Sequence, residues 1–418
     1  MAKNPYVIGV GMTKFGNILE TPEIKDKTFQ ELLAEAAFEA YDDAGISPED
    51  IDAFLVGNML PETSMSNSQS TNSSDWLGLR CKPGFHIDTA CDTTLTAIGV
   101  ARDMIMSGRY RNILVVAGEI TNSYPDENAD FPLKRKPLSP IKLWKWTDYA
   151  VDHNFGYQHF YGFDALTGIN GLAYMKTNNL SFEEFDRVML QINKNVRFHA
   201  ATNPKAFLYE KGTLEEEAQR EGFSSVEDYW KSEKNPFLAW PVRRKSGLTT
   251  ADGASAIILS SEPEKYTKKL PIEVSGFGYA TYNWPWDGSA EVIAFKDSYA
   301  MAGIKPEDID YLSVHDCLQI AHLNTSETAG YFKKGEAWKA ILDGRTRFNG
   351  DKPMNTSGGR GGVGHAFEAS AGADTYEIVK QMRGEAGERQ IKKPIRVAVQ
   401  HNAGYALHIA VAVYKPGK

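Results

Sequence analysis

The 418-residue sequence predicts an α/β fold made of two similar halves, with a separate region inserted between them. The first observation is a repeat, since Ala44–Asp52 and Ala302–Asp310 agree at eight of nine positions. In both places the segment follows a helical pattern and precedes an apolar strand. The second observation is the alternation of strands and helices within each half, which is typical of α/β layers. The third is an aromatic-rich stretch at about 121–245, which is too long for a simple loop.

The first half opens with an apolar strand at residues 6–10, followed by a helix at 28–44. The helix is predicted because apolar residues recur on one side of it, namely Phe29, Leu32, Leu33, Ala37 and Tyr41. Gly45 follows, and glycine commonly ends a helix. A short strand at 51–56 comes next, because a brief apolar run bounded by turn residues favours a buried strand.

Each half then repeats the order of strand, helix and strand. In the first half, the segment 85–91 leads into a helix at 94–107 and a strand at 112–117. In the second half, residues 364–365 open a helix that runs to about residue 382, and a strand follows at 395–399. Each half therefore presents its first chemically reactive residue at the N-terminus of a helix.

The predicted domains are an N-terminal half at 1–120 completed by 246–265, an inserted loop subdomain at 121–245, and a C-terminal half at 266–418. Aromatic side chains are more often part of a core than of a binding site. A packing or oligomer surface is therefore the simplest role for the insert. The chain returns to the strand pattern of the first half at 251–259.

The composition argues against several classes of protein. Lys and Arg total 46 against 54 Asp and Glu, and the net charge of −8 argues against nucleic-acid binding. The three cysteines are a poor disulfide framework, and no CxxC pair indicates a structural zinc. The apolar runs are too short to span a membrane, and the N-terminal residues lack the apolar core of a signal peptide. We therefore expect a cytoplasmic protein without a metal site and without membrane or nucleic-acid partners.

Cys91 lies between a predicted strand and a predicted helix. A thiol at a helix N-terminus lies near the positive end of the helix dipole, which lowers the pKa and enriches the nucleophilic thiolate. The small residues that follow would let a substrate carbonyl approach the backbone N–H groups. The position alone is equally compatible with a buried core cysteine, which is common.

His365 ends a glycine-rich loop with five glycines in the seven residues 358–364. Such a loop frees the backbone for close approach to a ligand. The spacing matches neither a P-loop nor a dinucleotide-binding motif, so a nucleotide fold is disfavoured. A histidine presented by this loop could activate a cysteine of the other half, although a capping or core histidine is an equal alternative.

Further candidates follow two strands of the second half. His315 and Cys317 come after the repeated segment, and alternate residues of an extended chain point to the same side. Ligands bind at the carboxyl ends of strands in α/β proteins. A metal site would need two more ligands that the local sequence does not supply, so a donor and acid pair is favoured. Residues 401–404, after the strand at 395–399, could face the same pocket.

These motifs resemble the thiolase family almost from end to end, from residues 6–15 to 411–414. Residues 315–318 read His-Asp-Cys-Leu, where the sterol-carrier-protein-type and archaeal thiolases carry His-Asp-Cys-Phe. Residues 400–404 read Gln-His-Asn-Ala-Gly, which is also similar to that branch. Further similar segments are 203–206, 251–254 and 383–390.

The resemblance implies a five-layered α/β/α/β/α thiolase fold of two similar halves and CoA thioester substrates. It implies coenzyme A as co-substrate, with no covalently bound cofactor, and a homodimer or tetramer. That branch often works with a small zinc-ribbon and OB-fold partner protein, so such a partner is expected here.

The resemblance also implies roles for individual residues. Cys91 matches the acylated nucleophile, and His365 matches the histidine that activates it. His315 matches the group that binds the thioester oxygen, and Cys317 matches the acid/base cysteine. The backbone N–H of Cys91 and those of residues 402–404 match the oxyanion hole.

The resemblance places His401, Asn402 and Gly404 in the pocket that contains the oxyanion hole. Three departures from the family pattern alter its surroundings. Gly-His-Pro-Leu-Gly is replaced by Gly-His-Ala-Phe-Glu, which adds Phe367 and Glu368 near the pantetheine thiol, and Leu318 replaces phenylalanine. Arg360 stands in the glycine-rich loop, where it could pair with a substrate carboxylate or be a solvated surface residue.

We therefore expect an acyl-CoA C-acyltransferase that cleaves a 3-oxoacyl-CoA with free CoA through an acyl-cysteine, or runs in reverse. The altered pocket and the aromatic insert favour a bulky, aromatic or acidic acyl group, as in benzoylsuccinyl-CoA. One alternative is a thiolase-like aldolase that cleaves a 3-hydroxyacyl-CoA, a reaction compatible with Tyr405. Another is a non-catalytic CoA-binding subunit.

Overall fold

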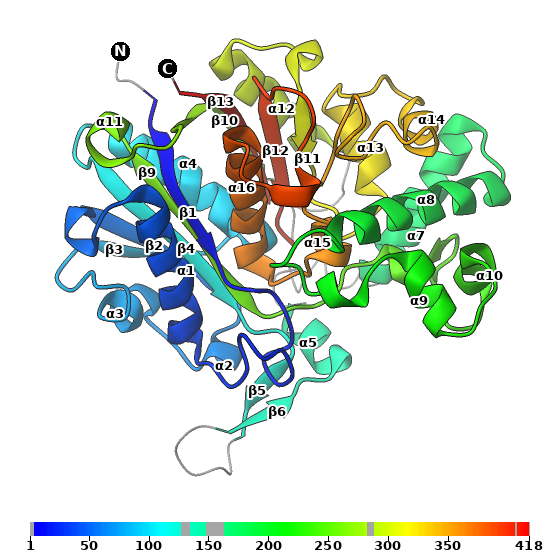
Figure 1. The fold of residues 1–418 in the computed structure, drawn as a ribbon, viewed down its shortest axis with the longest axis horizontal. Helices are drawn as coiled ribbons and strands as arrows, with labels where there is room; N and C mark the ends of the chain where they lie inside the picture. The colour runs from blue at the N-terminus through cyan, green and yellow to red at the C-terminus, as the bar shows by residue number, and fades with distance from the viewer. Residues whose placement is uncertain (1–3, 127–133, 148–162, 282–287, 406–407, 418) are drawn as a thin grey trace.

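A computed structural model describes residues 4–126, 134–147, 163–281, 288–405 and 408–417 of the protein. The aromatic residues between 148 and 162, which contributed to the expected insert, lie outside the described residues. The fold is built around one nine-stranded mixed sheet with helices on both faces (Figure 1). No described helix combines the length and the apolar character that a membrane crossing requires. The cytoplasmic location stays a prediction.

The strands of the sheet lie in the order β11-β12-β13-β10-β1-β9-β4-β2-β3. Their bounds are β1 (Tyr6–Met12), β2 (Ala53–Gly57), β3 (Gly84–Ile87), β4 (Asn112–Glu119), β9 (Gly253–Ser260), β10 (Ile272–Thr281), β11 (Tyr311–Ser313), β12 (Ala398–Ala403) and β13 (His408–Pro416). Only β2–β3, β2–β4 and β11–β12 are parallel, and the other neighbours are antiparallel. Strands β1 and β10 meet at just two residue pairs, so the sheet divides there into two halves.

The two halves share one topology, which confirms the prediction from the repeat. Starting at the junction, β1, β9, β4 and β2 of the first half correspond to β10, β13, β12 and β11 of the second. The directions agree as well, since in both halves the second strand is antiparallel to the first and the third, and the fourth is parallel to the third. The exact domain boundaries stay a prediction.

Helices complete the layers. Helix α1 (Phe29–Ala44) covers one face of the first half, α12 (Ser289–Ala302) covers the second half, and α4 (Thr93–Met106) and α16 (Phe367–Arg383) pack against strands of both (Figure 1). The layers thus run helix, sheet, helix, sheet, helix, as expected. Helix α1 begins with a capping box, in which the Thr28 side chain accepts from Glu31 N–H. It ends at Gly45 in a left-handed conformation.

Two glycines let α1 pack closely on β1. A Cβ atom at Gly9 would lie 2.3 Å from the Ala40 carbonyl oxygen, and one at Gly11 would lie 2.1 Å from that of Ala36. Real Cβ atoms do not approach backbone oxygen so closely. Close packing of this helix on the sheet therefore depends on glycine at both positions.

The later helices of the inserted region form a small layer beside the second half, while its first two strands and first helix, within residues 123–147, lie near the first half (Figure 1). Its elements are β5 (Ser123–Pro125), β6 (Arg135–Pro137), α5 (Pro140–Thr147), α7 (Phe163–Asn178), α8 (Phe182–Ala200), α9 (Leu214–Arg220), α10 (Val226–Lys231), β7 (Phe237–Ala239) and β8 (Val242–Arg243). The remaining helices are short, namely α2 (Pro61–Ser64), α3 (Gln69–Ser74), α11 (Pro263–Tyr266), α13 (Ala321–Thr328), α14 (Ala337–Leu342) and α15 (Gly359–Gly362). Helix α8 contacts α14 and α15, which ties the insert to the loop that carries His365.

Candidate active site

Cys91 lies in a short turn, Ala90–Asp92, that joins the end of β3 to the N-terminus of α4. Ala90 has a left-handed φ of +56°, which residues other than glycine rarely adopt. Hydrogen bonds hold the strained turn. The N–H of Thr89 donates to the Thr93 hydroxyl at 2.8 Å, and that hydroxyl donates to the Ala90 carbonyl at 2.7 Å. The surrounding contacts thus maintain a backbone conformation that presents Cys91 at the start of α4.

His365 and His315 approach from the second half. The backbone N–H of His365 donates to the Thr249 carbonyl at 2.7 Å, and its carbonyl accepts from Ala251 at 3.1 Å. Its ring Nδ1 lies 3.0 Å from the Ser370 hydroxyl, while the buried Nε2 has no partner among the described residues. The His315 ring, just beyond β11, meets the His365 ring edge to face, with the ring centroids 5.3 Å apart.

The structure brings the candidate nucleophile and both imidazoles together. The Sγ of Cys91 and one ring nitrogen each of His315 and His365 all lie within 4.8 Å of one another. Cys317 is close enough to raise the pKa of the Cys91 thiol electrostatically. Because Cys91 belongs to the first half and the other three residues to the second, the site exists only where the two halves meet.

Burial governs the protonation of the two thiols. The pKa of Cys91 is raised far above its usual range, first by burial and then by Cys317 and Asp92, and burial raises the pKa of Cys317 to about 12. The prediction that the helix dipole lowers the pKa of Cys91 is therefore wrong for the free protein. Loss of hydration disfavours the thiolate more strongly than the helix N-terminus favours it.

The two imidazoles are neutral for the same reason. The pKa of His365 is held well below its usual range by burial and then by the positive charge of Arg360. Burial, Arg360 and the neighbouring histidines lower the pKa of His315 in the same way. The resting site therefore holds a thiol beside a neutral imidazole whose Nε2 can accept a proton. Proton transfer from Cys91 to His365 can accompany attack on a substrate.

Arg360 does not lie where a substrate carboxylate could pair with it. The residue is 2% exposed, and its Nη1 and Nη2 donate to the two carboxylate oxygens of Asp374 at 2.9 and 2.6 Å. Its backbone N–H donates to Asp316 at 2.8 Å. Both sequence interpretations of Arg360, a substrate partner or a solvated residue, are therefore wrong. The bidentate pair instead places a buried positive charge behind the two histidines.

The glycine-rich loop packs against the insert. Within it, α15 is fully buried, and a Cβ at Gly358 or Gly362 would lie 2.8 or 2.6 Å from the Cβ of Ala200 in α8. These glycines therefore allow close approach of a helix, and the structure gives no support to a ligand cradle there. The insert thereby supports the loop that presents His365.

Asn402 and Gly404 lie at the end of β12, close to the nucleophile. The side-chain amide of Asn402 donates to Asp374 at 3.0 Å and lies 3.5 Å from the ring of His315. The N–H of Gly404 already donates to the His408 carbonyl at 2.7 Å, so it is not free to bind an oxyanion as predicted. A Cβ at Gly404 would lie 2.0 Å from the Thr89 carbonyl oxygen, which shows why glycine is needed there.

The N–H aimed at Cys91 belongs instead to the next residue. A backbone hydrogen bond from Tyr405 lowers the pKa of the Cys91 thiol, against the stronger effect of burial. Sequence reasoning missed this residue because it placed the oxyanion hole within residues 402–404. The turn after β12 determines which N–H faces the sulfur, and no sequence motif marks that choice.

His401 faces the opposite side of β12 from Asn402. Its ring stacks on Phe295 of α12 with centroids 5.5 Å apart, and its Nε2 lies 3.3 Å from Glu291. Side chains of a strand alternate between its two faces, so neighbours cannot both enter one pocket. The expectation that His401 belongs to the pocket is therefore wrong. Its ring instead accepts the backbone N–H of His315 at 3.5 Å.

Phe367 lies beside the candidate nucleophile. Its ring is 2% exposed and meets the His365 ring edge to face, with the centroids 5.2 Å apart. It packs in an apolar cluster with Leu60, Leu138 and Leu143, against which Cys91, Met59 and Tyr124 also pack. Residues of the first half, the insert and the second half therefore form an apolar wall next to the sulfur.

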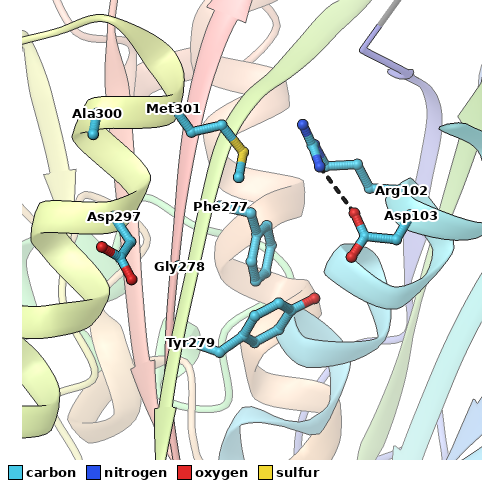
Figure 2. Close-up of a pocket in the computed structure, with 8 residues that line it drawn as sticks. All are labelled: Arg102, Asp103, Phe277, Gly278, Tyr279, Asp297, Ala300 and Met301. Carbon is cyan, nitrogen blue, oxygen red and sulfur yellow. Dashed lines mark hydrogen bonds and ion pairs between the residues drawn. The ribbon is translucent and has the colours of Figure 1, made fainter. Parts of the chain in front are cut away.

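A surface hollow lies elsewhere, between α4, β10 and α12. Figure 2 shows Phe277 and Tyr279 of β10 turned toward α4, where Arg102 and Asp103 form an ion pair. None of the catalytic candidates lines this hollow. The convergence of reactive side chains around Cys91, and not this hollow, identifies the candidate active site.

Cys91, His315 and His365 also form the one group among the described residues with the spacing of three metal ligands. One thiolate and two neutral imidazoles suit Zn²⁺, which takes nitrogen and sulfur ligands. The local sequence around His315 and Cys317 could not reveal this set, because its members come from three distant segments. The expectation that the protein has no resident metal stays a prediction.

We expect added Zn²⁺ to protect Cys91 reversibly from alkylation by iodoacetamide, because the metal would occupy the sulfur and His365 Nε2. Peptide mass spectrometry would measure the alkylation rate, and a chelator should restore it. Mg²⁺, which prefers oxygen ligands, serves as the control and should have no effect. Equal alkylation of Cys91 with and without Zn²⁺ would contradict the expectation.

Comparison with known proteins agrees with the motifs. Residues 5–146 match the family model for the thiolase N-terminal domain, and residues 286–415 match that for the thiolase C-terminal domain-like family. An acetyl-CoA acetyltransferase of Methanothermobacter thermautotrophicus is 29% identical over 409 residues, which cover 95% of each chain. Human sterol carrier protein 2 is 27% identical over 440 residues, covering 99% of this chain and 72% of that protein.

Solved structures share the fold. An Ltp2-ChsH2(DUF35) aldolase superposes with a TM-score of 0.74 at 18% identity, covering 99% of this chain and 98% of that chain. Human mitochondrial 3-ketoacyl-CoA thiolase in complex with CoA gives a TM-score of 0.69 at 18% identity, covering 100% and 99%. The matched family models span both halves and include Cys91, His315 and His365. The chain therefore belongs to the thiolase superfamily.

Proposed function

We propose that this thiolase-family acyltransferase cleaves a 3-oxoacyl-CoA with free CoA through an acyl group carried on Cys91. The observation that carries the proposal is the approach of the Cys91 sulfur to the rings of His315 and His365, within 4.8 Å. The relatives named acetyl-CoA acetyltransferase support the reaction class. The structural neighbour solved with CoA supports the co-substrate.

In the first step the Cys91 sulfur attacks the 3-oxo carbon while its proton passes to Nε2 of His365. The bond between the α and β carbons then breaks, and its electron pair forms the enolate of the departing thioester. Cys317, whose thiol is protonated at neutral pH, donates the proton that converts this enolate to the shortened acyl-CoA. The remaining acyl group stays bound to Cys91.

In the second step the thiol of free CoA gives its proton to the Cys317 thiolate and attacks the acyl carbon. The Cys91 sulfur leaves and recovers its proton from His365. Both steps develop negative charge on an oxygen beside Cys91, where the N–H of Tyr405 already points. We assign this N–H and that of Cys91 to one oxyanion site, and His315 with Asn402 to the thioester oxygen.

The apolar wall beside Cys91 supports a bulky or aromatic acyl group, and the benzoyl part of benzoylsuccinyl-CoA has this character. Leu60, Leu138, Leu143 and Phe367 make the surroundings of the sulfur apolar, which suits an aromatic acyl group. Because Arg360 is committed to Asp374, it gives no support to recognition of the substrate carboxylate. The proposal of benzoylsuccinyl-CoA therefore rests on the aromatic group.

The test is mass spectrometry of the intact protein and its peptides after incubation with 3-oxoacyl-CoAs of increasing bulk. We expect an added acyl mass on the peptide that contains Cys91, with aroyl groups transferred faster than acetyl, and its loss when free CoA is added. Acylation confined to another residue, or none with any substrate, would contradict the proposal.

The second candidate function is retro-aldol cleavage of a 3-hydroxyacyl-CoA. A structural neighbour is described as an aldolase, and the backbone N–H of Tyr405 reaches Cys91 in this chain. This reaction forms no acyl-cysteine and consumes no free CoA, so CoA dependence of product formation separates the two. A non-catalytic CoA-binding subunit would cleave neither substrate.

We also propose an oligomer and a partner chain. Strand β3 lies at the edge of the sheet, and its Phe85 is 44% exposed, which supports pairing with a second copy. The aldolase neighbour is described together with a DUF35 chain, which supports a small zinc-ribbon and OB-fold partner here.

A further inference from the structure

Three carboxyl side chains lie beside the turn that carries Cys91, two of them buried and the third, that of Asp88, exposed. They are Asp88 before the turn, Glu119 at the end of β4, and Glu368 in the first turn of α16. Glu119 and Glu368 are each 0% exposed. Glu119 accepts the Asn58 side-chain amide at 2.7 Å and further backbone N–H groups of residues 59–60. It is therefore satisfied as an acceptor.

Glu368 is not satisfied in the same way. Its Oε1 lies 2.9 Å from the Thr93 hydroxyl oxygen, whose one proton goes to the Ala90 carbonyl, while its buried Oε2 has no donor among the described residues. The Asp88 carboxyl lies within hydrogen-bonding reach of Glu368. Because Glu368 is fully buried whereas Asp88 is exposed, the missing donor is a proton held by Glu368 itself, which it can donate to Asp88. Burial first, and then the charges of Asp88 and Glu119, raise the pKa of Glu368 well above its usual range.

This acid pair connects the nucleophile to its base. Asp88 accepts the N–H of Ala90, the left-handed residue directly before Cys91, at 2.9 Å. Glu368 lies three residues after His365, and its backbone carbonyl accepts the Thr94 hydroxyl of α4. The pair therefore joins the strained turn of the first half to the helix of the second half that follows the base.

We propose that Glu368, as the protonated partner of Asp88, is a positioning residue that holds Cys91 against His365, and that its ionisation at alkaline pH releases this contact. The inference rests on the proposed function for its effect on turnover. It concerns a residue outside the reacting set, at a position where the family pattern has glycine.

The neighbours of Glu368 explain why its charge matters. Asp88 faces it from the turn and Glu119 from β4, so both facing ionisable groups are acidic. Helix α4 presents the Thr93 hydroxyl, and β2 presents Gly57, where a Cβ would lie 2.8 Å from Oε2. An ionised Glu368 would therefore be repelled by the charges of Asp88 and Glu119, and its buried side chain has no access to water.

The sign of the pH effect follows from the raised pKa of Glu368. At pH values above the usual pKa of a glutamate, the Glu368 side chain of the unfolded chain has released a proton that the folded protein still holds. The free energy of unfolding contributed by Glu368 therefore falls as the pH rises, until the folded protein also releases the proton. Removing the ionisable group should flatten this dependence.

The decisive variant is Glu368→Gln, in which the side-chain amide keeps the shape of the carboxyl group and can donate to Asp88 but cannot ionise. We expect a kcat within about threefold of the parent at neutral pH. The alkaline decline of kcat should move upward by at least about one pH unit, with KM for CoA unchanged. Glu368→Ala removes the pair and should lower kcat about tenfold or more at every pH.

A second measurement does not depend on acyl transfer. Without a negative charge at Glu368, the Cys91 thiolate is less disfavoured, so Glu368→Gln should lower the pH midpoint of Cys91 alkylation by iodoacetamide. Glu377→Gln is the matched control, because Glu377 lies on the same helix but pairs with Arg389 at 2.8 Å. It should lower thermal stability without moving either pH profile.

The outcomes separate the two proposals. An unchanged alkylation midpoint and an unchanged alkaline limb in Glu368→Gln would overturn the positioning role, even if the parent protein is an active thiolase. A shifted alkylation midpoint in a protein that forms no acyl-cysteine would retain the positioning role and overturn the proposed function. If Glu368→Gln fails to fold, Asp88→Asn, which removes the charge facing Glu368, should shift the same midpoint downward.

Discussion

Replacing Cys91 with alanine should abolish thiolysis, lowering kcat by roughly 10⁴-fold or more. In the proposed mechanism this sulfur forms the bond to the acyl group, and no other described thiol shares the approach to His315 and His365. The fold should remain, because the turn is held by backbone and hydroxyl hydrogen bonds of Thr89 and Thr93 and not by the sulfur. The release of thioester products from a 3-oxoacyl-CoA would measure the activity. Circular dichroism would measure whether the fold remains.

Cys81→Ala is the matched control for this variant. Cys81 is a free, exposed cysteine and is not part of the proposed site. Its replacement should leave both kcat and acylation of Cys91 unchanged. Near-normal thiolysis in Cys91→Ala would refute the assignment of the nucleophile, whatever the behaviour of the control.

The second large effect is expected for His365→Asn, which should lower kcat by roughly 10²- to 10⁴-fold. Asparagine fills part of the space and can still bond Ser370, but it cannot accept the proton of Cys91. Pre-steady-state mass spectrometry should show slow formation of the acyl-cysteine, while KM for CoA changes little. Formation of acyl-enzyme at the parent rate would exclude His365 as the base.

The pH dependence of the parent protein tests the same role. Because burial and Arg360 hold the pKa of His365 well below its usual range, the imidazole stays neutral through the mildly acidic range. Thiolysis should therefore not decline between pH 7 and pH 6 through protonation of His365. His86→Gln, a change at an exposed histidine on β3, is the control and should keep the parent profile.

The outline of the fold could be predicted because it depends on local patterns that repeat. The eight shared residues at Ala44–Asp52 and Ala302–Asp310 both precede the strand that lies parallel to its neighbour, β2 in one half and β11 in the other. Apolar periodicity and glycine caps then determined the helices on either side. These features act over a few residues, and a sequence displays them directly.

The errors at the site come from side-chain pairing, strand alternation and hydration, which the motifs do not record. Arg360 of α15 pairs with Asp374 of α16, and that pairing removes it from any substrate. His401 and Asn402 are adjacent, yet the alternation of β12 sends their side chains to opposite faces. The pKa of Cys91 depends on how completely other segments exclude water from its sulfur.

The sequence by itself determined that two related α/β halves exist and that a cysteine and a histidine each stand at the start of a central helix. It also contained the family motifs that include Cys91, His315 and His365. Only the tertiary structure decided which N–H faces the sulfur, which charges are paired, and that the buried Glu368 lies beside Asp88. Motifs record residue types in order, whereas protonation and pairing depend on distance and hydration, which arise only when both halves close around the site.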